Sequence, residues 1–293
     1  MRLGSFEVIE PLPDLKSPHA FAILRPWIDA GNVGTMVLNR LEGLFDAKEI
    51  GRLVRPGNFF DFTRYRPTMY YKEGVRQLVL PNSIISCARR ESRNDFVFLH
   101  LLEPHMFGER YTSSVLLILE KLGVQRYCLL GSMYDMVPHT RPLLVSGGAV
   151  GAHAIAELDR AGVGRSNYQG PTTICHLISQ QATMLGIETM SLITHLPQYT
   201  ELDEDYTGQV RLLEVFQSLY GIPVNKIDIQ KAQQQIKDIE IAVNNNRKVK
   251  EVVAQLEAMY DARIAAGKKE EMPRLSPEIE NFLKEMEKRF RQT

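Results

Sequence analysis

The sequence predicts an α/β fold in which helices cover both faces of a mixed sheet, followed by a helical C-terminal subdomain. Up to about residue 225, short apolar runs alternate with stretches of helical periodicity, which is typical of strands and helices that follow one another. Beyond that point the charged fraction rises from about 20% to about 38%, and 19 of the 20 glycines lie before it. These shifts indicate a core domain at residues 1–225 and a helical subdomain at 226–293.

The elements of the core domain follow from their residue patterns. The apolar run 21–28 predicts a buried strand, and residues 35–45 predict a helix because their apolar side chains recur at helical spacing. Closely spaced runs between residues 68 and 102 are separated by turn signals, which favours antiparallel pairing among them. The remaining predicted strands are 68–71, 76–80, 84–88, 96–102, 127–133, 143–145 and 190–194, and the remaining predicted helices are 111–122, 172–185 and 206–220.

The helical subdomain contains two seams of apolar residues, at 229–243 and 249–259, in which apolar side chains recur alternately every three and four residues. The seams are out of phase, and three asparagines at 244–246 lie between them. This arrangement predicts either one long helix with a stutter or, as the asparagines favour, a helical hairpin. Ser276 before Pro277 predicts the start of a last helix. These helices either pack on their own domain or offer a surface to another copy or a partner.

Composition excludes several classes of protein. Thirty-five basic and 35 acidic residues give a net charge of zero among 293 residues, which disfavours binding to nucleic acid or to a membrane surface. The N-terminus is too charged for a secretion signal, and the longest uncharged apolar run, 115–119, is far too short to span a membrane, so we expect a cytoplasmic protein. Cys87, Cys128 and Cys175 are expected to be buried free thiols.

The first candidate site is the turn Asp29-Ala-Gly-Asn-Val-Gly34 between the first predicted strand and helix. Backbone amides at a helix N-terminus can hold an anion, and Gly31 and Gly34 would let a ligand approach closely. The turn has neither a complete dinucleotide fingerprint nor a P-loop ending. It is therefore either a structural turn capped by Asn32 or Thr35, or a small-ligand site.

The second candidate site is the loop Pro138-His139-Thr140-Arg141, which follows the strand predicted at 127–133. Two prolines fix the backbone around a histidine that can titrate near neutrality and a guanidinium that can hold an oxyanion. Loops that follow parallel strands lie at one edge of the sheet, so this loop and the Asp29 turn could form one site. The alternative is a rigid loop in which Arg141 pairs with an acidic neighbour such as Asp29.

The remaining histidine and serine patterns give no metal-binding or nucleophile motif. His100 and His105 flank Glu103, yet no zinc-binding spacing accompanies them, so we predict no metal site. Ser132 lacks a nucleophile-elbow sequence, and no catalytic residue can be named. The residues indicate no particular cofactor.

Several stretches together resemble the proteasome assembly chaperone 2 family. They span about residues 20–225 in the family's order, and the tail resembles that of bacterial members near 256–261. The stretches are Asp29-Ala-Gly-Asn-Val-Gly34, Glu103-Pro104, Val137-Pro-His-Thr-Arg-Pro142, Tyr168-Gln-Gly-Pro171 and His195-Leu-Pro-Gln-Tyr199.

The resemblance implies a three-layer α/β/α fold similar to that of nucleoside phosphorylases, and a homo-oligomer. Some relatives act as chaperones of proteasome assembly, and the neutral charge, the missing catalytic constellation and the helical tail favour a non-enzymatic binding module or assembly chaperone. Relatives that dock on proteasome rings end in a hydrophobic-Tyr-any residue tail, whereas this chain ends Phe290-Arg-Gln-Thr293, so a proteasome is not the expected partner. The C-terminal helices could bind another protein.

The alternative function is an enzyme or sensor for a small anionic ligand, such as a nucleotide or nucleoside, with ATP-grasp-like or phosphorylase-like chemistry. Its ligand would lie at the Asp29 to Gly34 and Pro138 to Arg141 loops. The candidate ligand-binding residues are Asp29, Gly31, Asn32, Gly34, Glu103, His139, Thr140 and Arg141.

Overall fold

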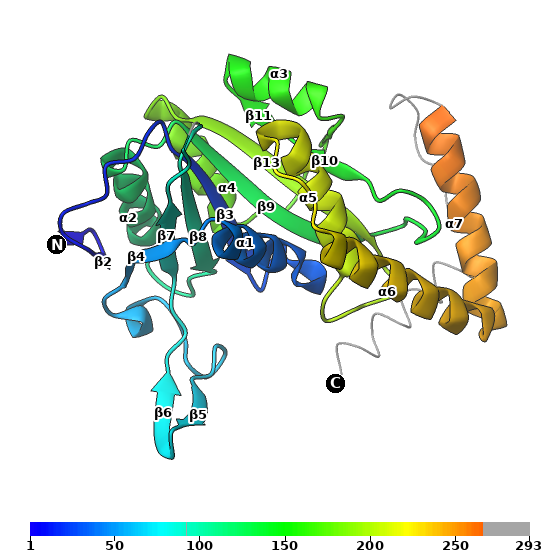
Figure 1. Cartoon of the computed structure of the whole chain (residues 1–293), viewed down its shortest axis with the longest axis horizontal. Helices are drawn as coiled ribbons and strands as arrows, with labels where there is room; N and C mark the ends of the chain where they lie inside the picture. Colours follow the sequence, from blue (N-terminus) through cyan, green and yellow to red (C-terminus); the bar gives the residue numbers. More distant parts are fainter. Residues whose placement is uncertain (92, 266–293) are drawn as a thin grey trace. The chain divides into compact units, whose positions relative to one another are not determined.

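The computed structural model describes residues 1–91 and 93–265 (Figure 1). The chain divides into two units. The first unit consists of Met1–Asp29, Gly34–Gly131 and Ser146–Ile193. The second consists of Ala30–Val33, Ser132–Val145 and the chain from Thr194 onward. The chain crosses between the units several times.

A large mixed sheet forms the frame of the fold, in the order β1-β2-β4-β7-β8-β3-β9-β13-β10-β12, with β11 paired to β13. Its central strand β3 (His19–Arg25) pairs in parallel with β8 (Phe96–Leu102) and β9 (Arg126–Asp135). The pairs from β8 to β1 are antiparallel. The other strands are β1 (Arg2–Leu3), β2 (Phe6–Val8), β4 (Lys48–Leu53), β5 (Thr68–Lys72), β6 (Val75–Val79), β7 (Ile84–Ala88), β10 (Val145–Gly147), β11 (Ala149–Val150), β12 (Gly164–Arg165) and β13 (Glu188–Pro197).

Helices cover both faces of this sheet in the first unit, as predicted. Residues of β3 alternate between the faces, so Ala20, Ala22 and Leu24 pack in one core with α2 and α4, while Phe21 points to the face that α1 covers. The fold is thus α/β with helices on both sides of a mixed sheet. The helices are α1 (Val33–Leu44), α2 (Gly108–Lys121), α3 (Ala152–Arg160), α4 (Ile174–Met184), α5 (Tyr206–Tyr220), α6 (Lys226–Asn244) and α7 (Arg247–Ala265).

The strands predicted at 68–71 and 76–80 pair with each other but not with the rest of the sheet. β5 and β6 are antiparallel, as the turn signal at 72–74 indicates, but they form a separate two-stranded sheet and do not join the large one. We call residues 64–80 the β5–β6 arm, and Figure 1 shows it projecting from the sheet. β4, which the sequence analysis missed, takes a place in the large sheet between β2 and β7.

The second unit contains the described part of the C-terminal helices. The Asn225 side chain caps α6 by accepting a hydrogen bond from the Ile227 N–H, at 2.8 Å. The asparagine run ends α6 at Asn244, and α7 begins at Arg247, so the region is two helices. Their facing residues Val243, Val252 and Leu256 form a small apolar core with Tyr199. The helix predicted from Ser276 lies outside the described residues.

The three cysteines are buried free thiols, as the sequence predicts. Burial raises the pKa of the Cys128 and Cys175 thiols to about 12. They are therefore packing residues that stay protonated at neutral pH.

Candidate functional site

The Asp29 carboxylate caps helix α1. Oδ1 accepts hydrogen bonds from the N–H groups of Gly34 and Thr35, at 2.7 and 3.3 Å, and Oδ2 accepts one from the Thr35 hydroxyl at 2.6 Å. Burial raises the pKa of Asp29, while these hydrogen bonds and the charge of Arg25 act in the opposite direction. The cap is thus neither Asn32 nor Thr35, the two candidates of the sequence analysis. N–H groups that could hold an anion here already bond to the chain's own carboxylate.

Gly31 and Asn32 lie against the turn that starts α5. The Gly31 backbone has φ = 56°, and a Cβ there would stand 2.7 Å from the Cβ of Asp205, so only glycine fits without a shift. The Asp205 N–H donates to the Gly31 carbonyl at 2.9 Å, and the Asn32 amide donates to the Asp203 carbonyl at 2.8 Å. Gly31, which was predicted to let a ligand approach closely, therefore allows the close approach of the acidic turn 203–205.

Glu103 follows β8 and points toward the start of α4. Its Oε1 accepts a hydrogen bond from the Ile174 N–H at 3.3 Å, while its buried Oε2 has no hydrogen-bond partner among the residues that the structure describes. Burial raises the pKa of this carboxyl. The Tyr65 hydroxyl donates to the Glu103 carbonyl at 3.0 Å, which joins the base of the β5–β6 arm to this strand end.

The loop 138–141 binds elements of its own unit. Tyr199 accepts a hydrogen bond from the His139 N–H at 2.8 Å, and its hydroxyl also lies 2.6 Å from His139 Nδ1. Burial lowers the pKa of this histidine, against the opposing charges of Glu240 and Glu257. The imidazole is therefore neutral at neutral pH.

Arg141 holds helix α7. Its guanidinium makes two hydrogen bonds to the carboxylate of Asp261, at 3.0 and 2.9 Å, and a third to Glu257 at 3.3 Å. Thr140 also donates to Glu257. The two parallel hydrogen bonds that a guanidinium can offer to a bound oxyanion are thus made to a carboxylate of the chain itself. That carboxylate belongs to Asp261 and not to Asp29.

The predicted residues consequently fall into separate groups. Gly31 and Asn32 contact the 203–205 turn, and His139 to Arg141 contact Tyr199 and α7. Within the described residues, no hydrogen bond or ion pair joins these two groups. A shared ligand site at the two loops remains a prediction.

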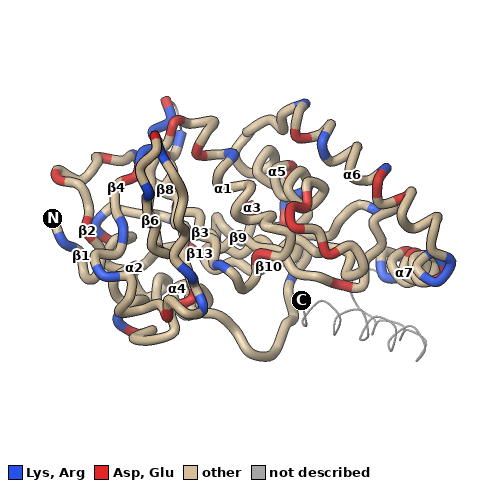
Figure 2. Tube along the Cα trace, turned by 90° about the horizontal axis from the view of Figure 1, so that it is seen from below, with Lys and Arg blue, Asp and Glu red and all other residues tan. Residues whose placement is uncertain are grey.

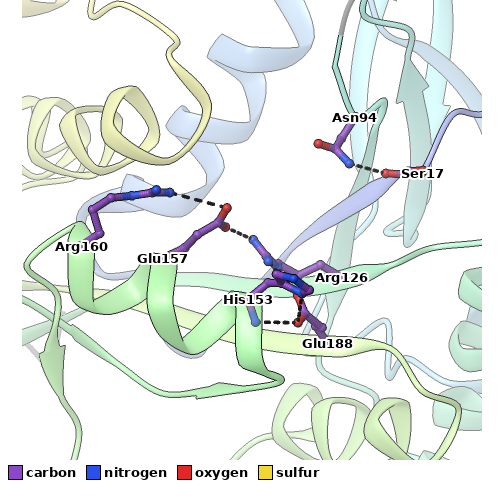
Figure 3. A network of polar contacts seen from close by, with 7 residues as sticks. All are labelled: Ser17, Asn94, Arg126, His153, Glu157, Arg160 and Glu188. Atoms are coloured by element: carbon purple, nitrogen blue, oxygen red, sulfur yellow. Dashed lines mark hydrogen bonds and ion pairs between the residues drawn. The ribbon is translucent and has the colours of Figure 1, made fainter.

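A buried charge cluster in the first unit escaped the sequence analysis (Figure 3). Arg126 of β9 is only 3% exposed, and its guanidinium pairs with Glu157 of α3 and, at 2.7 Å, with Glu188 of β13. Burial and the Arg126 charge lower the pKa of His19 to about 4. The carboxylates of Glu157 and Glu188 compensate the buried charge of Arg126 and join a helix to two strands, so the cluster explains packing and not ligand binding.

The sequence analysis predicted both strands of the β5–β6 arm but did not identify the arm as an exposed apolar surface. All ten residues of the two strands are exposed. Seven large apolar side chains of the arm have exposed fractions between 42% and 65%: Met69, Tyr70, Tyr71, Val75, Leu78, Val79 and Leu80. Exposed apolar side chains gathered on one hairpin in this way mark interaction sites in soluble proteins.

No three His, Cys, Asp or Glu side chains among the described residues are grouped so that they could hold a metal ion. None of the helices that the structure describes has the length and apolar character to cross a membrane.

Comparison with known proteins gives a family and a fold. The PAC2 family profile matches residues 23–243. A Mycobacterium tuberculosis protein of unknown function is 25% identical, with a TM-score of 0.78 over 91% of this chain and 92% of its own. No curated protein matches.

Two further solved structures share the fold. A proteasome-assembly chaperone homologue of M. tuberculosis is 24% identical, with a TM-score of 0.70 over 80% of this chain and 99% of its own. An archaeal proteasome activator of Pyrococcus furiosus is 14% identical, with a TM-score of 0.64 over 81% of this chain and 97% of its own.

Proposed function

Because the chain belongs to the PAC2 family, we propose that it is a non-enzymatic protein-binding module with an assembly-chaperone-like role. Two proteins that share its fold are named as a proteasome-assembly chaperone homologue and a proteasome activator. Those names describe those proteins. The surface of this chain supplies the support that is specific to it.

The observation that carries the proposal is the exposed β5–β6 arm. A two-stranded hairpin is at best marginally stable in water, and its free strand edges can pair with another chain. Here seven large apolar side chains are exposed on such a hairpin. A protein surface that covers them would remove this apolar area from water, which favours association.

The predicted loops support binding over catalysis. The groups best suited to bind an anion are the N–H groups at the start of α1 and the Arg141 guanidinium, and both are engaged inside the chain, the first with Asp29 and the second with Asp261 of α7. Their roles in holding helices require no substrate. We therefore assign no catalytic residue.

The proposal includes self-association and a cytoplasmic location, and it assigns no ligand or cofactor. A proteasome stays among the candidate partners. The argument against it drawn from residues 290–293 has no support, since proteins named for proteasome assembly and activation share this fold.

A photo-crosslinking residue tests the proposal. We would place p-benzoylphenylalanine at Tyr70 on the arm and, in a matched control, at Lys121, an exposed residue of α2 in the same unit. We expect discrete protein crosslinks from position 70 and none from position 121. Crosslinking at position 70 no stronger than at position 121 would contradict the proposal.

A further inference from the structure

Three neighbouring strands of the first unit place polar residues in otherwise apolar runs. Arg25 ends β3, Ser86 lies within β7 and His100 lies within β8. Side chains alternate along a strand, so Arg25 lies on the same face as Phe21, and His100 on the same face as Phe98, whose ring packs against Phe21. Ser86 is the cross-strand partner of Phe98 and shares that face. All three polar residues therefore lie on the face that α1 covers.

These side chains line an open pocket beside α1. The pocket has a volume of about 530 Å³, and α1 contributes Asn39 and Glu42 to its lining. All of its lining residues belong to the first unit. A space of this size can hold a small organic molecule.

Arg25 brings an unpaired cation to this pocket. It is half-buried, and its buried Nε atom has no hydrogen-bond partner among the residues that the structure describes. Its charge lowers the pKa of Asp29, but the Asp29 carboxylate is already bonded to the start of α1. Because a partly buried charge without a counter-ion is costly, a ligand carboxylate beside Arg25 would be stabilised by charge-assisted hydrogen bonds.

His100 and Glu42 form a dyad in the same pocket. His100 Nε2 lies 2.9 Å from Glu42 Oε2, and the Ser86 hydroxyl donates to Glu42 Oε1. Burial raises the pKa of Glu42, but the hydrogen bonds and the charge of His100 and the bond from Ser86 outweigh it, so the pKa is lowered. The ionised carboxylate only accepts, and His100 therefore donates from Nε2. In the neutral imidazole, Nδ1 is then an acceptor, and no described residue hydrogen-bonds to it.

The charges of the lining define the ligand. Asp46 and Glu49 also line the pocket, and each pairs with a basic neighbour at 2.6 Å. This leaves one cation, Arg25, and one anion, Glu42, for a ligand to meet. Acidic and basic residues are interspersed along the trace of the first unit (Figure 2). A phosphate dianion would be opposed by the three carboxylates, whereas a molecule with one positive and one negative group matches the pocket.

We propose that this pocket binds a zwitterionic amino acid, with the ligand carboxylate on Arg25 and the ligand ammonium group on His100 and Glu42. The partner of His100 in β3 is Ile23, so the Cα atoms of Arg25 and His100 are about 8 Å apart. Two long side chains at this spacing can converge on neighbouring groups of one small ligand. The inference goes beyond the proposed protein-binding function and does not depend on it.

NMR of the full chain, labelled with ¹³C at histidine Cε1, provides the test because it reports on the pocket directly. The chain has seven histidines, and a His100→Gln variant identifies the His100 signal by its loss. Each standard L-amino acid is added at about 10 mM, which detects dissociation constants in the millimolar range. Each amino acid that binds is compared with its deaminated acid, with its decarboxylated amine and with inorganic phosphate.

Three variants connect the signal to the pocket. Arg25→Gln removes the cation, and Asn39→Trp places a bulky ring in the pocket from an exposed position of α1 without altering the buried groups. The matched control is Leu44→Trp, which changes a residue of α1 that is 47% exposed and outside the lining. Circular dichroism checks that the variants are folded, and Asn39→Trp keeps the test decisive if Arg25→Gln is not.

We expect at least one amino acid to shift the His100 signal in a saturable way. Its deaminated and decarboxylated analogues should bind about tenfold or more weakly, because each lacks one charge-assisted interaction, and Arg25→Gln should weaken binding by a similar factor. Asn39→Trp should abolish binding, and Leu44→Trp should leave it unchanged.

A His100 signal that no amino acid shifts would overturn the inference. So would binding that persists in Asn39→Trp. A deaminated acid or inorganic phosphate that binds as tightly as the amino acid would also overturn it, because the site would then be one for anions alone. Tyr70 does not line the pocket, so crosslinking from position 70 tests the proposed function separately, and either result can fail without the other.

Discussion

Replacing Asp29 with alanine tests whether this residue is a structural cap. The change strands the Gly34 N–H and the Thr35 hydroxyl, which lie 2.7 and 2.6 Å from the carboxylate oxygens. Hydrogen bonds to a charged group contribute about 1.5–3 kcal/mol each, and loss of an N-cap costs about 1 kcal/mol. Burial raises the pKa of Asp29 because the charged carboxylate is costly to desolvate. The alanine variant avoids this cost, which offsets part of the loss. We expect Asp29→Ala to lower the free energy of unfolding by about 2–3 kcal/mol.

Asp29→Asn is the matched control. Its side-chain oxygen can accept from the backbone N–H groups, and its amide can donate to the Thr35 hydroxyl, so we expect a loss below about 1 kcal/mol. Urea unfolding measures both variants by circular dichroism and by the fluorescence of Trp27, the single tryptophan, two residues from the substitution. An alanine variant within about 0.5 kcal/mol of the wild type would refute the capping role.

Three other substitutions follow from the same geometry. Gly31→Ala should lower the melting temperature, because the new Cβ combines a positive φ with a 2.7 Å approach to Asp205; an unchanged melting temperature would contradict the close packing. Arg141→Ala should release α7, which limited proteolysis would detect as faster cleavage in that helix; equal cleavage rates would show that the ion pairs do not hold it. Burial raises the pKa of Asp135, but the hydrogen bond and charge of His195 outweigh it and hold the pKa below its usual value. This stabilisation is present above the unfolded-state pKa of about 4 and is lost as the pH falls through the folded-state pKa. Asp135→Asn should therefore reduce the fall in the free energy of unfolding toward acid pH. An unchanged fall would count against the Asp135–His195 pair.

The sequence predicted the elements whose side chains alternate or recur regularly. β3 and β8 are apolar along nearly their whole length because helices cover both faces of the sheet. β4 was missed because its buried positions Ile50, Gly51 and Leu53 do not alternate, and a register shift between Glu49 and Gly51 accounts for this.

Pairing and partners depend on contacts that sequence patterns do not encode. The strand pattern found β5 and β6 but gave no sign that they leave the large sheet. The sequence analysis offered Arg141 either as a residue that holds an oxyanion or as one that pairs with an acidic neighbour such as Asp29. Its partner Asp261 is 120 residues further along the chain, and only the folded arrangement brings the two together. The same holds for Arg126 and Glu188, which are 62 residues apart.

Hydrogen exchange of the β5–β6 amides tests the central claim that the arm is a protein-binding surface. An uncovered hairpin opens readily, so its amides exchange fast, whereas docking against another chain protects them. The account predicts that amides of residues 68–79 are protected at high concentration of the full chain, where copies can associate, or after addition of cell extract, and that they lose this protection on dilution into buffer alone. Equally fast exchange in the concentrated, extract-supplemented and diluted samples would contradict it.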